Sequence, residues 1–419
     1  MNIIGILHSA TGLIIFPLIA LLFCVGQRKI NYKAWFAALA LQVVLALLFL
    51  KVAWFQIVFE WLNKVVILIE SASTAGTTFV FGYLGGGDVP FTEITGSNSY
   101  VFAFRALPLV IIMGAITALL SYWKILPLII QAMAKVFSKS LNIGGAVALS
   151  GAANVFVGMT EAPLFIRNSI KKLSSSELFM VMTLGMSTAA GTVLILYVTF
   201  LGEVIPNAIG HIFTASIISV PAAILMSVLI VPYDAKPTSS EAELAFDYSG
   251  PIDAVTQGGI NAMQMVINIT ALLICFIALV YLSNAIVGFL PDVGGQKLSL
   301  ERILGWTMAP VCWLMGIPWS EAVTAGGLMG IKTVLNELIA FINLSNLPEE
   351  ALSPRSDLII SYALCGFANF GSLGILIGGL STLAPERRDE ITKFGLLSIV
   401  SGTLATCMTA SVIGVISAL

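Results

Sequence analysis

The chain has 419 residues, of which 58% are apolar and only 10% are charged. Soluble domains carry about 25% charged residues, so this composition excludes a water-soluble globule and indicates a protein whose solvent is lipid. The formal net charge of −2 also excludes a protein that binds nucleic acid through a basic surface.

Long apolar runs recur along the whole chain, starting close to its first residue. A membrane-spanning helix takes about 20 apolar residues. The first run lacks the basic start and the small-residue cleavage site of a secretion signal, so we expect it to remain as the first span. Eight segments are long enough to span: 3–25, 32–50, 100–122, 177–201, 209–232, 264–289, 356–384 and 391–417.

Four other apolar stretches do not fit a simple span. The segments 53–70 and 125–138 carry charged residues, and we predict that they are amphipathic helices in the membrane interface. The segments 144–169 and 301–345 are interrupted by glycine, proline, asparagine and glutamate, and we predict that they are re-entrant hairpins. The predicted fold class is an all-α polytopic membrane protein with eight transmembrane helices, two opposed hairpins and interfacial helices.

The layout of the second half repeats that of the first. A hairpin, a glycine-interrupted span and a plain span follow one another in 144–232 and again in 301–419. A polar cytoplasmic linker with one span, 233–300, separates the two repeats, and 1–143 holds the N-terminal spans and interfacial helices. Because the two interrupted spans run in opposite directions, the repeat is inverted, which in transporters places a binding site at the membrane midplane.

Basic residues gather on one side of the predicted membrane. Lysine and arginine are concentrated in the cytoplasmic connections of membrane proteins. The basic clusters between spans all share that side when both termini face the periplasm of a bacterial inner membrane, which is the orientation we predict. The clusters comprise Arg28, Lys29 and Lys33; Lys124, Lys135 and Lys139; Arg167, Lys171 and Lys172; and Arg387, Arg388 and Lys393.

The first hairpin carries the strongest functional signal, a carboxylate beside a helix break. Residues 154–163 read NVFVGMTEAP, in which glycine and proline interrupt a helix. A charge inside a bilayer costs about 3 kcal/mol, so Glu161 must face protein, water or a ligand. The structural alternative is an ion pair with Arg105.

The second hairpin carries Glu337 within the run KTVLNEL, residues 332–338. The structural alternative is a shielding pair with Lys332, although two residues five apart are not ideal helix neighbours. Otherwise Glu337 is free to accept hydrogen bonds from adjacent hydroxyl groups of a ligand, which are strong, charge-assisted contacts.

Both interrupted spans contain a run of small residues, GMSTAAG over 185–191 and GFANFGS over 366–372. Close helix packing is the alternative explanation for such runs. Asn369 favours a functional role, because a buried amide needs hydrogen-bond partners. An unwound turn frees backbone carbonyls, and these carbonyls together with the side-chain oxygens of Asn154 and Thr188 would suit a hard cation such as Na⁺.

The chain carries no enzyme signature. It has no phosphate-binding loop, no HExxH zinc motif and only two histidines, so we predict that it is not an enzyme. Two alternatives to a solute carrier remain: an ion channel whose filter is built by the hairpins, and an intramembrane enzyme that uses Glu161 and Glu337 as a carboxylate pair.

These segments resemble the concentrative nucleoside transporter family. The matching runs are NVFVGMTEAP, KTVLNEL, CGFANFGS (365–372) and GIPWSEA (316–322), and the layout matches over nearly the whole chain. The resemblance implies a homotrimer whose protomers each move a transport domain against a scaffold, which would include the third and sixth spans and part of 1–143. It also implies Na⁺-coupled symport of nucleosides into the cell, with a proton-coupled nucleoside symporter as the closest alternative.

The resemblance implies roles for single residues. The nucleobase would contact the first hairpin tip, and the ribose hydroxyls would contact Glu337 and the second break. Na⁺, the coupling ion, would be held by the Asn154 and Thr188 side chains and by the carbonyls of Val157 and Ala189. The implied substrate-binding residues are Gly158, Met159, Thr160, Glu161, Val193, Glu337, Phe367, Asn369 and Ser372.

The chain departs from the family pattern at Met159, where glutamine is usual. A thioether cannot donate a hydrogen bond and accepts only weakly, so we expect the base preference to differ or to be broad. Thr188 stands where serine is common, and its hydroxyl keeps the sodium site intact. Some proton-coupled relatives lack the asparagine at the position of Asn154, so its presence here favours Na⁺.

Overall fold

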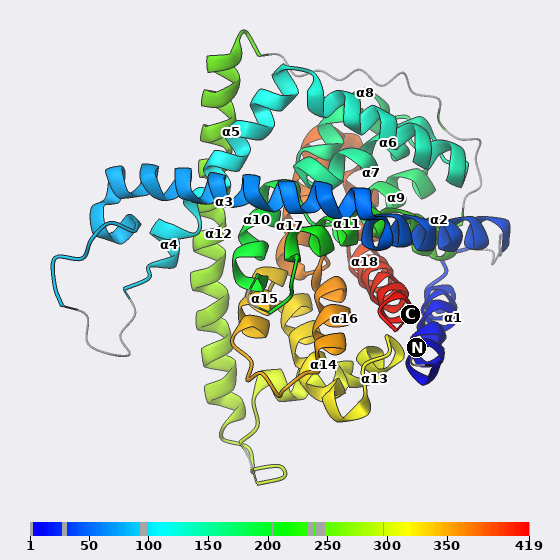
Figure 1. Ribbon diagram of the computed structural model, residues 1–419. Coiled ribbons are helices and arrows are strands. Elements are labelled where there is room, and N and C mark those ends of the chain that lie inside the picture. Colours follow the sequence, from blue (N-terminus) through cyan, green and yellow to red (C-terminus); the bar gives the residue numbers. More distant parts are fainter. Residues whose placement is uncertain are drawn as a thin grey trace.

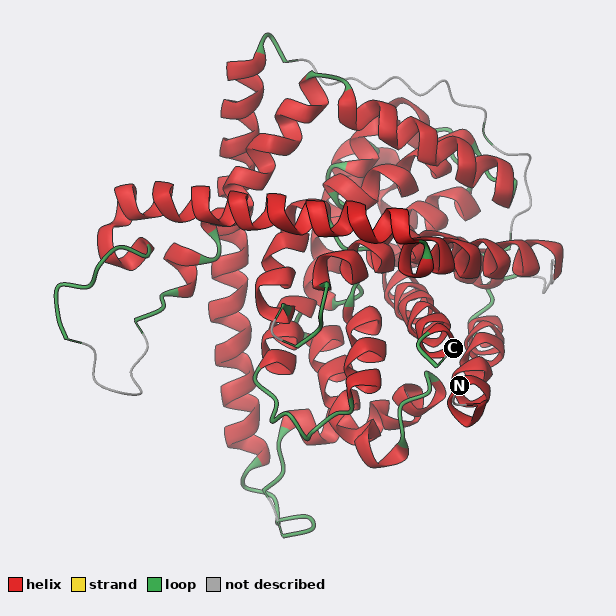
Figure 2. Ribbon diagram, viewed as in Figure 1, coloured by secondary structure: helices red, strands yellow, loops and turns green. Residues whose placement is uncertain are grey.

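The computed structural model describes residues 3–26, 32–92, 99–202, 204–232, 238, 248–295 and 297–418. Every regular element in these ranges is a helix, and three of them are short 3-10 turns (Figure 2). The predicted all-α fold class is therefore confirmed. Arg28, Lys29 and most of the predicted polar linker lie outside the described residues.

The described part of the first 141 residues contains six helices and one 3-10 turn. Only Val52 separates the second helix from the third, and Trp123 and Lys124 form the corner between the fifth and the sixth. The sixth helix covers the predicted interfacial segment 125–138. The elements are α1 (Ile3–Leu22), α2 (Tyr32–Lys51), α3 (Ala53–Phe81), η1 (Gly82–Gly85), α4 (Phe102–Arg105), α5 (Pro108–Tyr122) and α6 (Ile125–Leu141).

The next segment starts with the predicted first hairpin. Ser174 and Glu177 form a capping box that begins the helix after it, and that helix ends where Thr188 becomes extended. The predicted interruption of 177–201 therefore falls at residues 188–190. The elements are α7 (Gly145–Val157), η2 (Ala162–Ile166), α8 (Arg167–Ile170), α9 (Ser175–Ser187), α10 (Gly191–Leu201) and α11 (Ala208–Ile230).

A single long helix, α12 (Pro251–Val287), follows the linker. It has 37 residues and is about 55 Å long at 1.5 Å per residue. It begins at Pro251, not at residue 264 as predicted, because Pro251 occupies its first turn and the Asp253 carboxylate accepts from the Ser249 N–H at 2.9 Å. Polar side chains in its first half dilute the apolar run that the sequence analysis relied on.

The last part of the chain contains the predicted second hairpin, which holds three helices. α13 packs against α14 as α6 packs against α7. The order of elements thus places α6 before the first predicted hairpin as α13 stands at the start of the second, and the predicted repeat bounds stay a prediction. The elements are α13 (Leu300–Leu314), α14 (Trp319–Val334), α15 (Glu337–Ser345), α16 (Pro354–Leu364), α17 (Phe370–Leu383), η3 (Pro385–Arg387) and α18 (Arg388–Ile416).

Eight helical stretches among the described residues are long and apolar enough to cross a membrane, and seven of them match predicted spans. The eighth, Ala53–Gly85, includes the segment predicted to be interfacial, and Figure 1 shows α3 running crosswise to α12. The predicted interrupted span 356–384 consists of two short helices, α16 and α17, around a break at residues 365–369, within the glycine-rich region where the interruption was predicted.

The helices α5 and α12 pack along each other through small residues. A Cβ added at Gly114 would lie 2.5 Å from the Ala262 Cβ, and one added at Gly258 would lie 2.6 Å from the Ala118 Cβ. Small residues let membrane helices approach closely. α12 stands at one edge of the molecule with most of its surface exposed, whereas α9, α11 and α18 form the buried centre (Figure 1).

Candidate functional site

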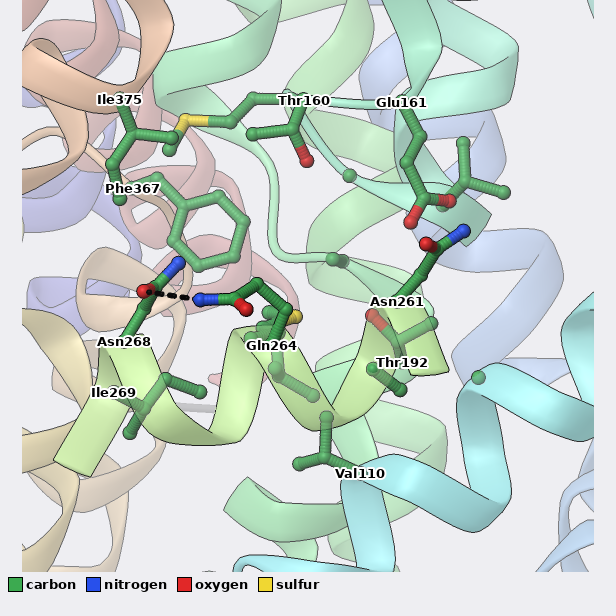
Figure 3. A pocket seen from close by; sticks show the side chains of 18 of the residues that line it. Val110, Thr160, Glu161, Thr192, Asn261, Gln264, Asn268, Ile269, Phe367 and Ile375 are labelled. Atoms are coloured by element: carbon green, nitrogen blue, oxygen red, sulfur yellow. Dashed lines mark hydrogen bonds between the residues drawn. The ribbon is translucent and has the colours of Figure 1, made fainter. Parts of the chain in front are cut away.

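A cavity of about 630 Å³ lies between the α5–α12 pair and the broken helices of both halves. Figure 3 shows side chains from both sides converging on it. The structure brings all nine residues predicted to bind substrate to its wall, although their contact with a ligand stays a prediction. They are Gly158, Met159, Thr160, Glu161, Val193, Glu337, Phe367, Asn369 and Ser372.

The first hairpin tip turns at Gly158, whose φ of 89° favours glycine. A Cβ at this position would also lie 2.7 Å from the Ala190 Cβ, so the tip sits directly against the break between α9 and α10. The turn leaves the Glu161 side chain at the cavity, where its carboxylate makes no hydrogen bond or ion pair with another described residue. The alternative pairing with Arg105 is wrong, because Arg105 instead donates to the Tyr83 carbonyl at 3.3 Å.

Glu337 begins α15 and is held from two sides. Its Oε1 accepts from the Tyr197 hydroxyl at 2.8 Å, and its Oε2 accepts from Asn369 Nδ2 at 3.0 Å. These bonds join α15 to α10 and α17, so the carboxylate links elements of both halves. The sequence analysis missed Tyr197, because an aromatic residue in an apolar span carries no distinguishing signal.

Lys332 does not form the ion pair with Glu337 that was the structural alternative. Its side chain is fully buried, and its Nζ donates to the Ala363 carbonyl at 3.0 Å and to Thr406 Oγ1 at 3.2 Å. The lysine therefore links α14 to the end of α16, just before the second break, and to α18. Glu337 keeps its lone pairs for Tyr197, Asn369 and the cavity.

The second break is organised by Asn369. Its Oδ1 accepts from the Ser372 N–H at 2.7 Å and so caps α17, while its Nδ2 donates to Glu337. Phe367 lies two residues before Asn369, with its ring at the cavity wall (Figure 3). Asn369 is thus both a helix cap and a positioning group for the carboxylate.

The four residues predicted to hold Na⁺ lie at the first tip and the first break. Asn154 Nδ2 donates to the Leu184 carbonyl at 2.7 Å and also contacts Thr188 Oγ1, so these two side chains meet. The Ala189 carbonyl accepts from Ser216 Oγ at 3.2 Å. Val157 ends α7, where the last carbonyls of a helix have no helical partner.

One atom of this group points to a ligand. Asn154 Oδ1 is buried and accepts no hydrogen bond from any described residue. Buried polar atoms are almost always paired, so an orphaned oxygen calls for a donor or a cation. The Thr188 hydroxyl and the Leu184 carbonyl lie against the nitrogen of the same amide, and together with Oδ1 these oxygen groups would suit a hard monovalent cation.

The side of the cavity formed by α12 was not predicted from the sequence. Four amide side chains project into it at spacings of four, three and four residues: Gln257, Asn261, Gln264 and Asn268. That spacing keeps them on one helix face. An amide stripe in an apolar span is a usable sequence signal, because polar groups in membrane helices face protein or water-filled cavities.

A bundle of membrane-spanning helices with a cavity between two pairs of broken helices is typical of a solute carrier. Family models for Na⁺-dependent nucleoside transporters match residues 11–84 at the N-terminus and 211–414 at the C-terminus, and a nucleoside recognition model matches 103–204. The chain belongs to the concentrative nucleoside transporter family. The resemblance seen in the sequence is therefore confirmed, and the family is one of transporters rather than enzymes.

Relatives in bacteria and mammals match nearly the whole chain. It is 34% identical to nucleoside permease NupC of Helicobacter pylori over 97% of each chain. It is 33% identical to putative nucleoside permease NupX of Escherichia coli over 98% of each chain. It is 31% identical to human solute carrier family 28 member 3, over 98% of this chain and 60% of that protein.

Solved structures share the fold closely. The protein is similar to CNTnw in an inward-facing substrate-bound state, with a TM-score of 0.88 and 35% identity over 98% of each chain. It is equally similar to a variant of CNTnw in an outward-facing state, with a TM-score of 0.90 and 35% identity over 99% of this chain and 98% of that one.

Proposed function

We propose that this protein carries nucleosides into the cell by symport with Na⁺, through alternating access of one cavity to the two sides of the membrane. The observation that carries the proposal is that Glu161 and Glu337 both line this one cavity. A nucleoside offers base N–H groups at one end and adjacent hydroxyls at the other, and two separated carboxylates can accept from both ends.

The orphaned Asn154 Oδ1 supports Na⁺ as the coupling ion. Asn154, Val157, Thr188 and Ala189 would supply side-chain and carbonyl oxygens next to the hairpin tip that bears Glu161. An ion held there would fix the tip in its substrate-binding form. Ion and nucleoside would then stabilise each other's binding without touching.

Alternating access is supported by the relatives, because CNTnw has been solved in inward-facing and outward-facing states and this chain resembles both. The moving part would comprise both hairpins and both interrupted spans. The static scaffold would include α5 and α12, whose close small-residue packing suits a rigid pair.

Assembly and orientation are part of the same proposal. The exposed apolar surface of α12 suits a homotrimer interface in a bacterial inner membrane. Both termini would face the periplasm, as the basic connections indicate. The two ends of the chain lie side by side in Figure 1, and α1 packs against α18, which agrees with a shared side.

The test is uptake of labelled uridine by liposomes that contain the purified protein. An inward Na⁺ gradient should drive accumulation, and replacing Na⁺ with choline at fixed pH should abolish it. Accumulation driven by a pH gradient in choline would instead establish the proton-coupled alternative. Ionic current that needs no nucleoside would establish a channel, and the absence of nucleoside uptake under every gradient would refute the proposal.

A further inference from the structure

The amide stripe on α12 faces the cavity but belongs to none of the predicted contacts. Gln257, Asn261, Gln264 and Asn268 span about 16 Å along the helix at 1.5 Å per residue. The remaining surface of α12 is largely apolar, with Ile260, Ile267 and Ile274 exposed. Polar side chains are costly in a membrane helix, so four amides on its cavity face indicate a partner within the cavity.

The four amides differ in what they already bind. Gln257 Nε2 donates to Asp253 at 2.8 Å, so the first amide of the stripe is used near the helix start. Gln264 Nε2 donates to Asn268 Oδ1 at 3.3 Å, which leaves the carbonyl of one and the amino group of the other available. The Asn261 amide makes no hydrogen bond to another described residue.

Figure 3 shows where the last three amides point. Asn261 extends toward the Glu161 carboxylate, whereas Gln264 and Asn268 extend toward the ring of Phe367. Glu161 is one of the two carboxylates that the proposed function assigns to the nucleoside, and Phe367 is one of the predicted substrate-binding residues. The amides therefore face the solute across the cavity from the hairpin tip.

Apart from the single hydroxyl of Thr160, the hairpin tip offers no side-chain donor for a base carbonyl. Ionised Glu161 only accepts, and the Met159 thioether cannot donate. The hydrogen-bonding edge of uracil is an N–H between two carbonyls, so a lone carboxylate satisfies the N–H but repels the carbonyl oxygens. An amide supplies both a donor and an acceptor, and Asn261, which extends toward Glu161 in Figure 3, has both available.

We propose that Asn261, assisted by the Gln264–Asn268 pair, binds the hydrogen-bonding edge of the nucleobase, so that α12 is a recognition wall and not only a scaffold. This inference rests on the proposed nucleoside transport. Because amides can donate and accept, such a wall tolerates different base edges. It gives this chain a means of reading the base that does not depend on Met159.

The experiment compares two ligands in equilibrium binding to the purified protein in Na⁺. One is uridine, and the other is a riboside that carries a benzene ring in place of the base. Asn261→Leu should weaken uridine binding about three- to tenfold, the loss of one or two neutral hydrogen bonds, and leave the benzene riboside unchanged. Gln264→Leu should also weaken uridine binding and leave binding of the benzene riboside unchanged. This second variant tests the stripe at a different position of α12.

The matched controls are Met263→Leu and Ile267→Leu, which change exposed positions on other faces of α12, away from the cavity lining. Both should bind the two ligands as wild type does. Unchanged uridine affinity in Asn261→Leu and Gln264→Leu would overturn the inference, as would an equal loss for both ligands or a loss of assembly at unchanged affinity. A wild-type protein that neither binds nor accumulates uridine would instead refute the proposed function.

Discussion

Glu337 combines a structural network with a free face on the cavity. Tyr197 and Asn369 each donate to one of its oxygens, and the negative charge of the carboxylate makes both bonds charge-assisted. The remaining lone pairs are those a pair of ribose hydroxyls would use. The network therefore fixes the carboxylate in place before a ligand arrives, which reduces the entropy cost of binding.

Glu337→Gln should abolish nucleoside uptake while the protein remains folded and assembled. The amide loses the charge and turns an N–H₂ group toward one of two donors, at a cost of about 1.5–3 kcal/mol for each charged hydrogen bond. Liposome uptake and size-exclusion chromatography would measure both properties. Uptake at the wild-type level by this variant would refute the assigned role.

Asn154→Ala should raise the Na⁺ concentration needed for half-maximal uptake by about tenfold or more, because the orphaned oxygen is removed. The control is Ser150→Ala, one turn earlier on the same buried helix face and outside the cavity lining. It should leave the Na⁺ dependence unchanged. An Asn154→Ala protein with the wild-type Na⁺ curve would contradict the ion assignment.

Met159→Gln should change base preference more than overall affinity. It adds a donor and an acceptor at the hairpin tip, where the thioether offers neither in strength. Competition of labelled uridine uptake by a panel of purine and pyrimidine nucleosides would reveal a new order of preference. The same order in both proteins would mean that residue 159 does not read the base.

At the scale of elements, the first hairpin depends on a tip that only glycine fits well. Gly158→Ala should strongly reduce uptake, because its φ of 89° costs an L-residue about 1–3 kcal/mol and its Cβ would lie 2.7 Å from the Ala190 Cβ. Gly374→Ala is the control, since that helical glycine has open space around it. Normal uptake by Gly158→Ala would show that the tip tolerates displacement.

The elements show how far sequence reasoning reached. Glycine, proline and asparagine indicated the positions of both helix breaks, because these residue types interrupt a helix. The two carboxylates stood out because a charge in a membrane segment is costly to desolvate. The start of α12 was missed by 13 residues, since Gln257 and Asn261 lowered its apolarity. The contacts of Lys332 and Tyr197 could not be predicted either, because they join residues far apart in the chain and depend on how the helices pack.

For the whole molecule, ion and solute should be thermodynamically linked. If Na⁺ strengthens uridine binding by a given factor, uridine must strengthen Na⁺ binding by the same factor. Titrations of each ligand at several fixed concentrations of the other would measure both factors. A uridine affinity that is independent of Na⁺ would exclude the proposed coupling even if both ligands bind.

The buried Lys332 gives the two halves unequal chemistry. Asn154 donates to the carbonyl of Leu184, and Lys332 donates to that of Ala363; each carbonyl lies six residues ahead of the residue that caps the resumed helix. If Na⁺ binds at Asn154, the positive charge in the first half is a dissociable ion. In the second half it is the ammonium group of Lys332, which is part of the chain. Loss of Na⁺ would then remove the positive charge beside the first helix break only. The two halves would therefore respond differently during the transport cycle.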